Sequence, residues 1–319
     1  MRILVVGAGA LGGYFGGRLK EAGRDVTFLV RPRRAEQLAK GGLIVRSPKG
    51  DISIAAPPTV FAENLRGPFD LVLLSCKAYD LQGAMDSFAP AVGANTAILP
   101  LLNGMKHMDA LGARFGAAAV LGGQCVISAT VDSEGRVLHL NDLHFLSFGE
   151  QNGAKSERVK AIAETFSNAK FDAALSTAIL QEMWEKWAII AAVAGITCLL
   201  RGAVGDIVAA GAGQRAMDIY AECCAIVAAN GFAPGESARK RSIGMLTTPG
   251  STFAASMLRD IERGAPIEAD HVIGDLLARG GGRNSSASTG DYPLLQIAYA
   301  HLRTYEARRQ HEKAAAPGR

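Results

Sequence analysis

Lys186 stands where a charged stretch of the chain gives way to an apolar one. The stretch "EMWEKWAIIAAVAGITCLL" runs from Glu182 to Leu200 and is almost wholly apolar beyond Trp187. An ammonium group at the edge of a cleft can donate a proton to a reacting oxygen. A lysine at the head of a buried helix can also extend along the apolar surface to reach water. Taken alone, the stretch favours this second interpretation.

The sequence "GAGALG" at residues 7–12 matches the G-x-G-x-x-G pattern of dinucleotide-binding turns. It follows an apolar run that indicates a buried strand, and it opens a helical stretch, which is the context that the pattern requires. Glycines here permit a tight turn, a close approach of the backbone to a pyrophosphate, and close packing of helix on strand. The alternative is a glycine-rich turn without a ligand. The predicted cofactor-binding residues of this turn are Gly7, Ala8, Gly9, Ala10, Leu11 and Gly12.

Three arginines follow the second predicted strand, which ends in "FLVRPRR". A site for NAD usually places Asp or Glu at this strand end, where the carboxylate accepts hydrogen bonds from the ribose 2′-hydroxyl. A guanidinium there suits the 2′-phosphate of NADP, which a carboxylate would repel. Asp25 lies at the opposite end of the strand. The sequence therefore favours NADP(H), with Arg31 as the best-placed residue, and the alternative is that Arg31, Arg33 and Arg34 belong only to a solvated loop.

These groups need a scaffold, and the hydrophobic patterns predict one. Strands are expected at residues 2–7 and 25–30, within 69–80, and at 96–104 and 119–131. The segments "VLHL" and "LHFLSFG" at 137–140 and 143–149 have the spacing of a β-hairpin. Alternation of strands and helices in the first half indicates a parallel sheet with helices on both faces.

Strand patterns almost vanish after about residue 175. Helices are predicted at 179–200, 213–230, 253–262, 268–279 and 292–309, with a flexible loop at 280–290 and a frayed tail from Lys313. The expected fold class is therefore α/β plus all-α. Residues 1–175 would form an N-terminal Rossmann-type domain that binds NADP, and residues 176–319 a C-terminal helical domain for substrate and catalysis.

Composition excludes several other classes of protein. A chain of 319 residues with 49% hydrophobic residues can form two domains with real cores, and its net charge of +4 is too small and too scattered to indicate nucleic-acid binding. The apolar run 188–200 is shorter than the about 20 residues that a membrane-spanning helix needs. The glycine-rich N-terminus does not fit a signal peptide. Five cysteines without zinc-site spacing favour a reducing compartment, no metal, and a cytoplasmic protein.

Six motifs together carry a resemblance to one family. They are "ILVVGAGALGGYFGGRL" at the start, "LVRPRR", "LLSCKAYD", "LLNGM", "WEKWA", and "SMLRDIERGAPIEADHVIGDLL" late in the chain. In length, order and content they resemble the ketopantoate reductases (2-dehydropantoate 2-reductases), which reduce a 2-oxo acid with NADPH. The resemblance covers nearly the whole chain. It implies a Rossmann domain followed by an all-α domain, with the reaction in the cleft between them.

The resemblance also implies roles for individual residues. Lys77 matches a lysine beside the cofactor, and Asn103 an asparagine near nicotinamide and substrate; an Asn–Gly turn is the alternative for Asn103. Lys186 matches the catalytic lysine that protonates the oxygen. Ser256 matches the serine that binds the substrate carboxylate. Glu268 matches an acidic residue that orients Lys186 or accepts a bond from a substrate hydroxyl, although carboxylates are also common in the first turn of a helix.

The stripe that continues from Lys186 along the helix departs from the family. Ile190, Ala194 and Thr197 follow it at spacings of four, four and three residues, so they should share its face. Typical family members have asparagines that contact the substrate at the first two positions. Hydrocarbon there predicts a less polar 2-oxo acid, because a site built for hydroxyl groups rejects ligands that lack them.

The sequence thus predicts an NADPH-dependent reductase that converts a 2-oxo acid to a 2-hydroxy acid, with ketopantoate or a less polar acid as its substrate. Two alternatives stay open. One is another NADP-dependent hydroxyacid dehydrogenase, and the other is an NADP-binding or sensing protein without catalysis. The expected partner is the small 2-oxo acid, with no nucleic acid or membrane, in a monomer or homodimer.

Overall fold

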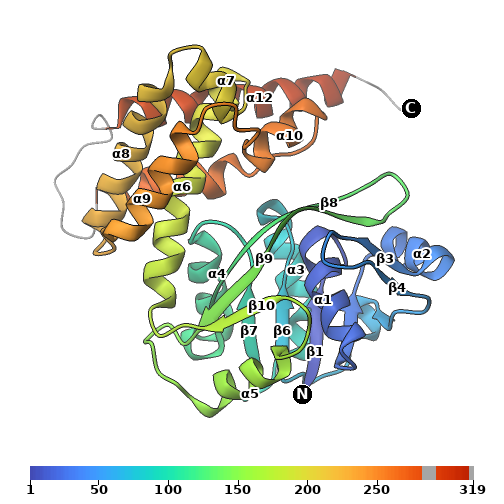
Figure 1. The fold of residues 1–319 in the computed structure, drawn as a ribbon. Helices are drawn as coiled ribbons and strands as arrows, with labels where there is room; N and C mark the ends of the chain where they lie inside the picture. The colour runs from blue at the N-terminus through green and yellow to red at the C-terminus, as the bar shows by residue number, and fades with distance from the viewer. Residues whose placement is uncertain (282–291, 316–319) are drawn as a thin grey trace. The chain divides into compact units, whose positions relative to one another are not determined.

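The computed structural model of the chain describes residues 1–281 and 292–315. The chain divides into two compact units, shown in Figure 1. The first unit comprises residues 1–102 and 107–180, and the second comprises 103–106 and 181–319. Most of the loop predicted at 280–290 lies outside the described residues, as do residues 316–319 of the predicted tail. Lys313 to Ala315 are helical instead of frayed, since alanine is the strongest helix former.

A parallel sheet forms the centre of the first unit, as the alternation of strands and helices predicted. Its strand order is β5-β2-β1-β6-β7, and every neighbouring pair is parallel. The strands are β1 (Arg2–Val6), β2 (Asp25–Leu29), β5 (Thr59–Val60), β6 (Leu71–Leu74) and β7 (Ala97–Pro100). Strand β2, which follows β1 in the chain, lies on one side of β1, and the later strand β6 lies on its other side. The carboxyl end of β1 is therefore a topological switch point, where open α/β sheets bind ligands.

A second, mixed sheet was not predicted. Its order is β10-β9-β3-β4, with β8 antiparallel to β9. The strands are β3 (Leu43–Arg46), β4 (Ile52–Ile54), β8 (Gly122–Val131), β9 (Val137–Gly149) and β10 (Asp172–Leu175). The sequence showed some of these segments as strands, but the sheet joins strands that lie far apart in the chain, which local patterns do not reveal.

The predicted hairpin within residues 137–149 is wrong, because β9 runs without a break through that segment. The turn lies between β8 and β9 instead. There the Asp132 carboxylate accepts hydrogen bonds from the backbone N–H groups of Glu134 and Arg136. Asn141 lies between the two segments of the predicted hairpin. Its side-chain oxygen accepts a bond from the Ser128 backbone N–H, and Asn141 therefore belongs to the ladder between the two strands.

Helix α1 (Ala10–Glu21) lies between the two sheets, and its glycines explain how it fits there. A Cβ on Gly16 would lie 2.7 Å from Phe28 of the parallel sheet, and a Cβ on Gly13 would lie 2.7 Å from Val137 of the second sheet. Both distances are too short for a real contact, so larger side chains would push the layers apart. The glycine-rich start of the chain therefore serves packing as well as the turn at residues 7–12.

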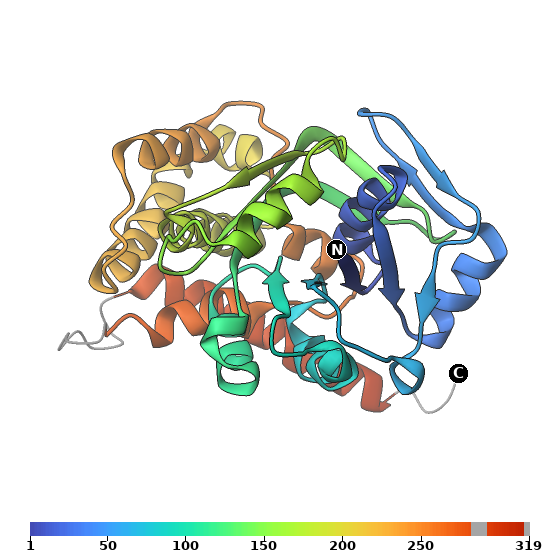
Figure 2. The same ribbon diagram turned by 90° about the horizontal axis from the view of Figure 1, so that it is seen from below.

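The other helices of the first unit flank both sheets, since α5 packs on β10 of the second sheet. Right-handed crossovers place α1 and α3 on opposite faces, because the chain leaves β1 and β6 in opposite directions along the sheet; Figure 2 shows this arrangement. The elements are α2 (Pro32–Gly41), α3 (Leu81–Phe88), α4 (Lys106–Phe115), α5 (Glu157–Phe166), and the 3₁₀ turns η1 (Ala62–Asn64), η2 (Ala78–Asp80), η3 (Ala89–Ala91) and η4 (Ala117–Ala119).

The second unit is helical, as predicted. Its elements are α6 (Ile179–Leu200), α7 (Val204–Ala209), α8 (Gly213–Ala229), α9 (Glu236–Thr247), α10 (Ser256–Glu262), the π-helical turn η5 (Asp270–Gly274), α11 (Asp275–Ala278) and α12 (Pro293–Ala315). The helix predicted at 268–279 is thus split into a π-helical turn and a short α-helix. Helices α7 and α9 were not predicted.

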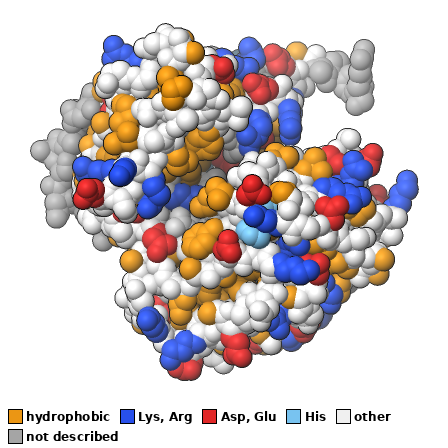
Figure 3. Space-filling model, viewed as in Figure 1, with side chains coloured by type: hydrophobic (Ala, Val, Ile, Leu, Met, Phe, Trp, Pro, Cys, Tyr) orange, Lys and Arg blue, Asp and Glu red, His pale blue; other side chains and the backbone are white. Residues whose placement is uncertain are grey.

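Helix α6 has the length and apolar composition of a membrane-spanning helix, and among the described helices it is the one that does. Of its most apolar window, 67% is buried within the protein, as in the core helix of a helical domain. On the face shown in Figure 3, acidic and basic side chains are interspersed. None of the five cysteines, all in the described ranges, forms a disulfide.

Candidate functional site

The glycine-rich turn has the geometry that a pyrophosphate needs. Gly7 has φ +89°, a left-handed conformation that favours glycine, and its N–H donates to the Leu29 carbonyl at 2.9 Å. A Cβ on Gly12 would overlap the Gly7 carbonyl oxygen and the Ser75 hydroxyl, whereas a Cβ on Gly9 would meet nothing within 4 Å. Gly12 therefore packs against the protein, and the space over Gly9 is open. This arrangement fits a dinucleotide whose phosphates approach the start of α1.

Two residues that the sequence did not single out hold this turn. The Ser75 hydroxyl, just beyond β6, donates to the Val6 carbonyl at 2.9 Å. The Arg34 guanidinium donates from Nε to the Ala8 carbonyl at 2.9 Å and from Nη1 to the Gly135 carbonyl at 2.7 Å. Burial lowers the pKa of Arg34. The only sequence signal for Ser75 was a small polar residue at the carboxyl end of a strand. Arg34 was one of three arginines beyond the second strand, of which Arg31 was favoured for the 2′-phosphate.

Arg31, which the sequence favoured for the 2′-phosphate, lies at the N-terminus of α2, directly beyond β2. Its Nη2 donates to the Asp80 carboxylate at 2.7 Å, and this hydrogen bond raises the pKa of the guanidinium. The Arg31 side chain is 73% exposed and that of Asp80 is 33% exposed. The second strand itself has no carboxylate at its carboxyl end. The fold brings the carboxylate of Asp80, from the segment after β6, to this place.

Lys77 and Asn103 follow two neighbouring strands of the parallel sheet. Lys77 is the residue before η2, beyond β6, and Asn103 lies three residues beyond β7. Both are half-buried. Gly104 has φ +79°, a left-handed conformation that favours glycine and is compatible with the Asn–Gly turn that was the alternative for Asn103. Residues 103–106 belong to the second unit, so Lys77 and Asn103 lie in different units.

His271, which sequence reasoning missed, packs against the Asn103 turn. A Cβ on Gly104 would lie 2.8 Å from the His271 carbonyl oxygen and 3.2 Å from its ring carbon Cδ2. The side chain is buried, and burial lowers its pKa, while the negative charge of Glu268 opposes that shift and a hydrogen bond joins the ring to the Asn103 backbone. His271 lies in the π-helical turn, a feature that often occurs at functional sites. It therefore ties the segment with Glu268 to the Asn103 turn.

The same π-helical turn is fixed to α6 beside Lys186. The indole Nε1 of Trp187 donates to the Val272 carbonyl at 2.8 Å, and Trp187 is fully buried. Lys186 is half-buried, and so is Glu268, which directly precedes the helical segment. The structure thus brings the predicted acid and carboxylate onto adjoining elements within the second unit.

The rest of the stripe becomes more buried along the helix. Ile190 is half-buried, whereas Ala194 and Thr197 are 3% and 0% exposed. The Thr197 hydroxyl donates to the Val193 carbonyl at 2.6 Å and accepts from the Ala255 backbone N–H at 3.3 Å. Thr197 therefore holds the start of α10, whose first residue is the exposed Ser256.

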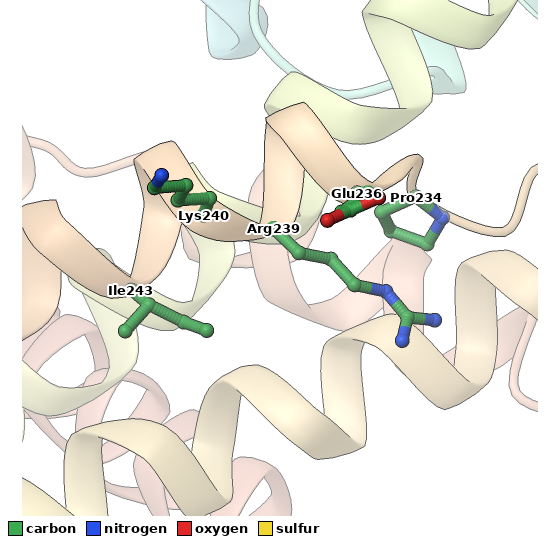
Figure 4. Close-up of a pocket in the computed structure, with 5 residues that line it drawn as sticks. All are labelled: Pro234, Glu236, Arg239, Lys240 and Ile243. Carbon is green, nitrogen blue, oxygen red and sulfur yellow. The ribbon is translucent and has the colours of Figure 1, made fainter.

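A hollow of about 480 Å³ lies elsewhere on the second unit, along the start of α9 (Figure 4). None of the predicted site residues lines it. Its lining residues are Pro234, Glu236, Arg239, Lys240 and Ile243. Within the described ranges, no group of three or more His, Cys, Asp or Glu side chains is arranged to hold a metal ion.

Comparison with known proteins gives one consistent result along the chain. Residues 3–153 match the family model "Ketopantoate reductase PanE/ApbA", and residues 178–306 match the model of its C-terminal part. The chain is 39% identical to an uncharacterized oxidoreductase of Bacillus subtilis, YkpB, over 96% of this chain and 99% of that protein. It is 30% identical to a 2-dehydropantoate 2-reductase of Mesorhizobium japonicum, over 86% and 89% of the two chains.

Solved structures agree on the fold. The crystal structure of a 2-dehydropantoate 2-reductase from Geobacter metallireducens matches with a TM-score of 0.85 and 29% identity, over 95% of this chain and 99% of that one. A D-mandelate dehydrogenase with NADH and anilino(oxo)acetate also matches with a TM-score of 0.85, over 97% and 100% of the chains. At 19% identity, this second likeness is one of fold alone.

Proposed function

Because the chain belongs to the ketopantoate reductase family PanE/ApbA, and so is an oxidoreductase that uses a nicotinamide dinucleotide, we propose that it reduces a 2-oxo acid to a 2-hydroxy acid with NADPH. The observation that carries the proposal is the turn at residues 7–12. Gly9 leaves open space and Gly12 packs on Gly7 and Ser75, as a pyrophosphate site requires, in a chain that matches this family along both units.

The residues of the chain have distinct roles in this proposal. When bound, the reduced nicotinamide supplies a hydride to the carbonyl carbon of the acid. Lys186 donates a proton to the carbonyl oxygen, and its positive charge stabilises the negative charge that develops there. Glu268 orients that ammonium or accepts a bond from a substrate hydroxyl. Ser256 binds the carboxylate of the acid, and Asn103 positions the reacting groups.

Arg31 and Lys77 would hold the adenosine end of the cofactor. Arg31 stands where the second strand ends, and its planar guanidinium suits a phosphate. Lys77 stands at the end of β6, next to the strand that carries the turn, where its ammonium can pair with phosphate or ribose oxygens. These positions support NADPH as the preferred reductant.

We expect the acid to be less polar than ketopantoate. Ile190 lies one helical turn beyond Lys186 and is half-buried, so hydrocarbon borders the acyl group at this position. Ala194 and Thr197 continue the stripe but are buried, and their part in substrate binding stays a prediction. An apolar wall accepts an apolar acyl group and gives a hydroxyl group no partner.

A substrate panel tests the proposal. The purified chain would be assayed for NADPH oxidation with ketopantoate and with a series of 2-oxo acids that carry aliphatic or aromatic groups. We expect turnover of 2-oxo acids, with the highest kcat/KM on an apolar member. A kcat/KM for ketopantoate well above the values for the other acids would contradict the proposed preference for an apolar acid. It would still agree with the proposed reaction.

One alternative is another hydroxyacid dehydrogenase on this fold, and Ile190 and Ala194 favour it because they depart from the family pattern. Profiling 3-oxo acids beside 2-oxo acids distinguishes the two. Absence of turnover on every acid, together with tight NADPH binding, would instead support a binding or sensing protein.

A further inference from the structure

The Arg31–Asp80 ion pair puts both recognition groups for the adenosine ribose at one place. In dinucleotide-binding sheets, a carboxylate at the end of the second strand bonds the 2′-hydroxyl of NAD, and an arginine there binds the 2′-phosphate of NADP. Arg31 stands directly beyond that strand, and the Asp80 carboxylate lies 2.7 Å from its guanidinium. With Arg31 but no carboxylate beside it, this place would have a recognition group for NADPH and none for NADH.

We propose that Asp80 is a residue that determines cofactor specificity, and that it makes the site accept NADH as well as NADPH. The inference rests on the proposed use of a nicotinamide dinucleotide and adds the group that sets the choice between the two forms. Asp80 would accept a hydrogen bond from the 2′-hydroxyl of NADH. Arg31 would bind the 2′-phosphate of NADPH.

The charges of Arg31 and Asp80 explain how the pair would discriminate between NADH and NADPH. A phosphate monoester carries about −1.5 to −2 charges at pH 7, so a carboxylate beside the same guanidinium repels it. Arginine has five N–H donors and can bond both anions, but the Asp80 charge then weakens phosphate binding. NADH brings a neutral hydroxyl to this position and meets no such repulsion. Asp80 therefore lowers affinity for NADPH and raises affinity for NADH.

The hydrogen bonds of Arg34 and the backbone on either side of the ion pair distinguish Arg31 from the neighbouring arginine. Arg34 already donates to the Ala8 and Gly135 carbonyls, and these bonds direct its guanidinium to the turn. Pro32 occupies the first position of α2, where its ring fixes the backbone next to Arg31. Asp80 is the N-cap residue of α3. The pair thus joins two fixed helix starts.

The test measures binding, so it does not depend on knowing the acid. Calorimetric titration of the full-length chain with NADPH and with NADH gives both dissociation constants in the absence of substrate. We expect Asp80→Asn to tighten NADPH and weaken NADH. The ratio of the two constants should shift toward NADPH by about tenfold, which corresponds to 1.4 kcal/mol. Arg31→Gln should weaken NADPH and leave NADH almost unchanged.

Asp86→Asn is the matched control. Asp86 also lies on α3 and also forms an ion pair with an arginine, Arg114, so the substitution removes the same charge from the same helix. It should leave the ratio at the wild-type value. The Asp80 side chain makes no capping hydrogen bond to α3, so Asp80→Asn should keep the melting temperature. If that variant melts early, Asp80→Glu provides the second test, because it keeps the carboxylate and should keep NADH binding.

Three results would overturn the inference. One is an Asp80→Asn ratio within twofold of the wild type. Another is an equal loss of both cofactors, which would mark Asp80 as merely structural. The third is a wild-type chain that binds NADPH but shows no binding of NADH. Failure of the proposed reaction would look different, since no 2-oxo acid would be reduced while the two dissociation constants still responded to Asp80→Asn.

Discussion

In the first unit, the turn at residues 7–12 lies at the switch point of the parallel sheet and is held by Ser75 and Arg34. In the second unit, the predicted acid and its companions come from separate helical segments. Ser75, just beyond β6, packs against Gly12 of α1 and donates to Val6 at the end of the adjacent strand β1. Lys186, Glu268 and Ser256 instead depend on the Trp187–Val272 bond and on the Thr197–Ala255 bond. Both sites therefore depend on contacts between residues far apart in the chain. Strand ends of one sheet and α2 hold the turn, whereas separate helical segments hold the acid site.

This difference teaches where substitutions should act. A side chain added in the turn should lower stability where it meets protein atoms, and should weaken cofactor binding where it enters the open space over the turn. A change in the second unit should alter turnover or substrate binding while NADPH binding persists. Four experiments can break or sharpen that contrast, from the largest expected effect to the smallest.

Lys186→Ala should lower kcat by about 10²–10⁴-fold, because positioned acids typically contribute that much. The dissociation constant for NADPH should hardly change, since the turn lies in the other unit. Stopped-flow turnover and titration of NADPH measure the two effects. Lys240→Ala, on the exposed surface of α9, is the control and should turn over normally. Near-normal turnover of Lys186→Ala would remove that residue from the mechanism.

Gly12→Ala and Gly9→Ala should separate folding from binding within a single turn. A methyl group at Gly12 overlaps the Gly7 carbonyl and Ser75, and overpacking of this kind costs about 1–3 kcal/mol of unfolding free energy. A methyl group at Gly9 meets no protein atom within 4 Å, and the backbone φ of −80° suits alanine. Gly9→Ala should therefore keep wild-type stability and bind NADPH weakly. Denaturant unfolding and titration distinguish the two, and equal stability losses would contradict the contrast.

Burial lowers the pKa of His144 in the first unit and of His271 in the second. His144 Nδ1 and the Tyr14 hydroxyl form a hydrogen bond of 2.8 Å, which joins α1 to β9. Because each folded-state pKa lies below the unfolded value of about 6.5, folding favours the neutral ring. This stability is complete above about pH 6.5 and is lost as the pH falls through the folded-state pKa.

Denaturant unfolding between pH 8 and pH 5 measures this loss. His144→Asn and His271→Gln should each flatten the dependence, and the double variant should flatten it further. His311→Gln, at an exposed position of α12, is the control and should retain the wild-type profile. A profile that stays unchanged in both single variants would show that other groups cause the acid sensitivity.

Thr197→Val should have the smallest effect. The substitution keeps the shape and removes the hydroxyl that accepts from the Ala255 N–H, at a cost of about 0.5–1.5 kcal/mol. A looser start of α10 should raise the KM for the acid a few-fold through Ser256, with little change in kcat. Thr247→Val is matched, since the Thr247 hydroxyl donates to the Ile243 carbonyl in the same i to i−4 manner on α9. A KM change of equal size in both variants would contradict a positioning role for Thr197.

Local patterns predicted much of the scaffold. The strands before and after the turn, the limits of α6, and the change to helices in the second half were all visible in the sequence, because each depends on periodicity over a few residues. The second sheet was missed because β3 and β9 pair across a separation of about ninety residues. The hairpin was misplaced because Asn141 and Asp142 resemble a turn, although Asn141 bonds across the strand pair.

The sequence by itself determined the glycine turn, the arginine beyond the second strand, the apolar stripe after Lys186, and the family motifs. Tertiary structure alone decided that Asp80 meets Arg31, that Arg34 holds the turn, and that His271 packs against Gly104. The physical reason is separation along the chain. A turn or a helix is specified by neighbouring residues, whereas an ion pair between residues 49 positions apart exists only after the strands between them have formed a sheet.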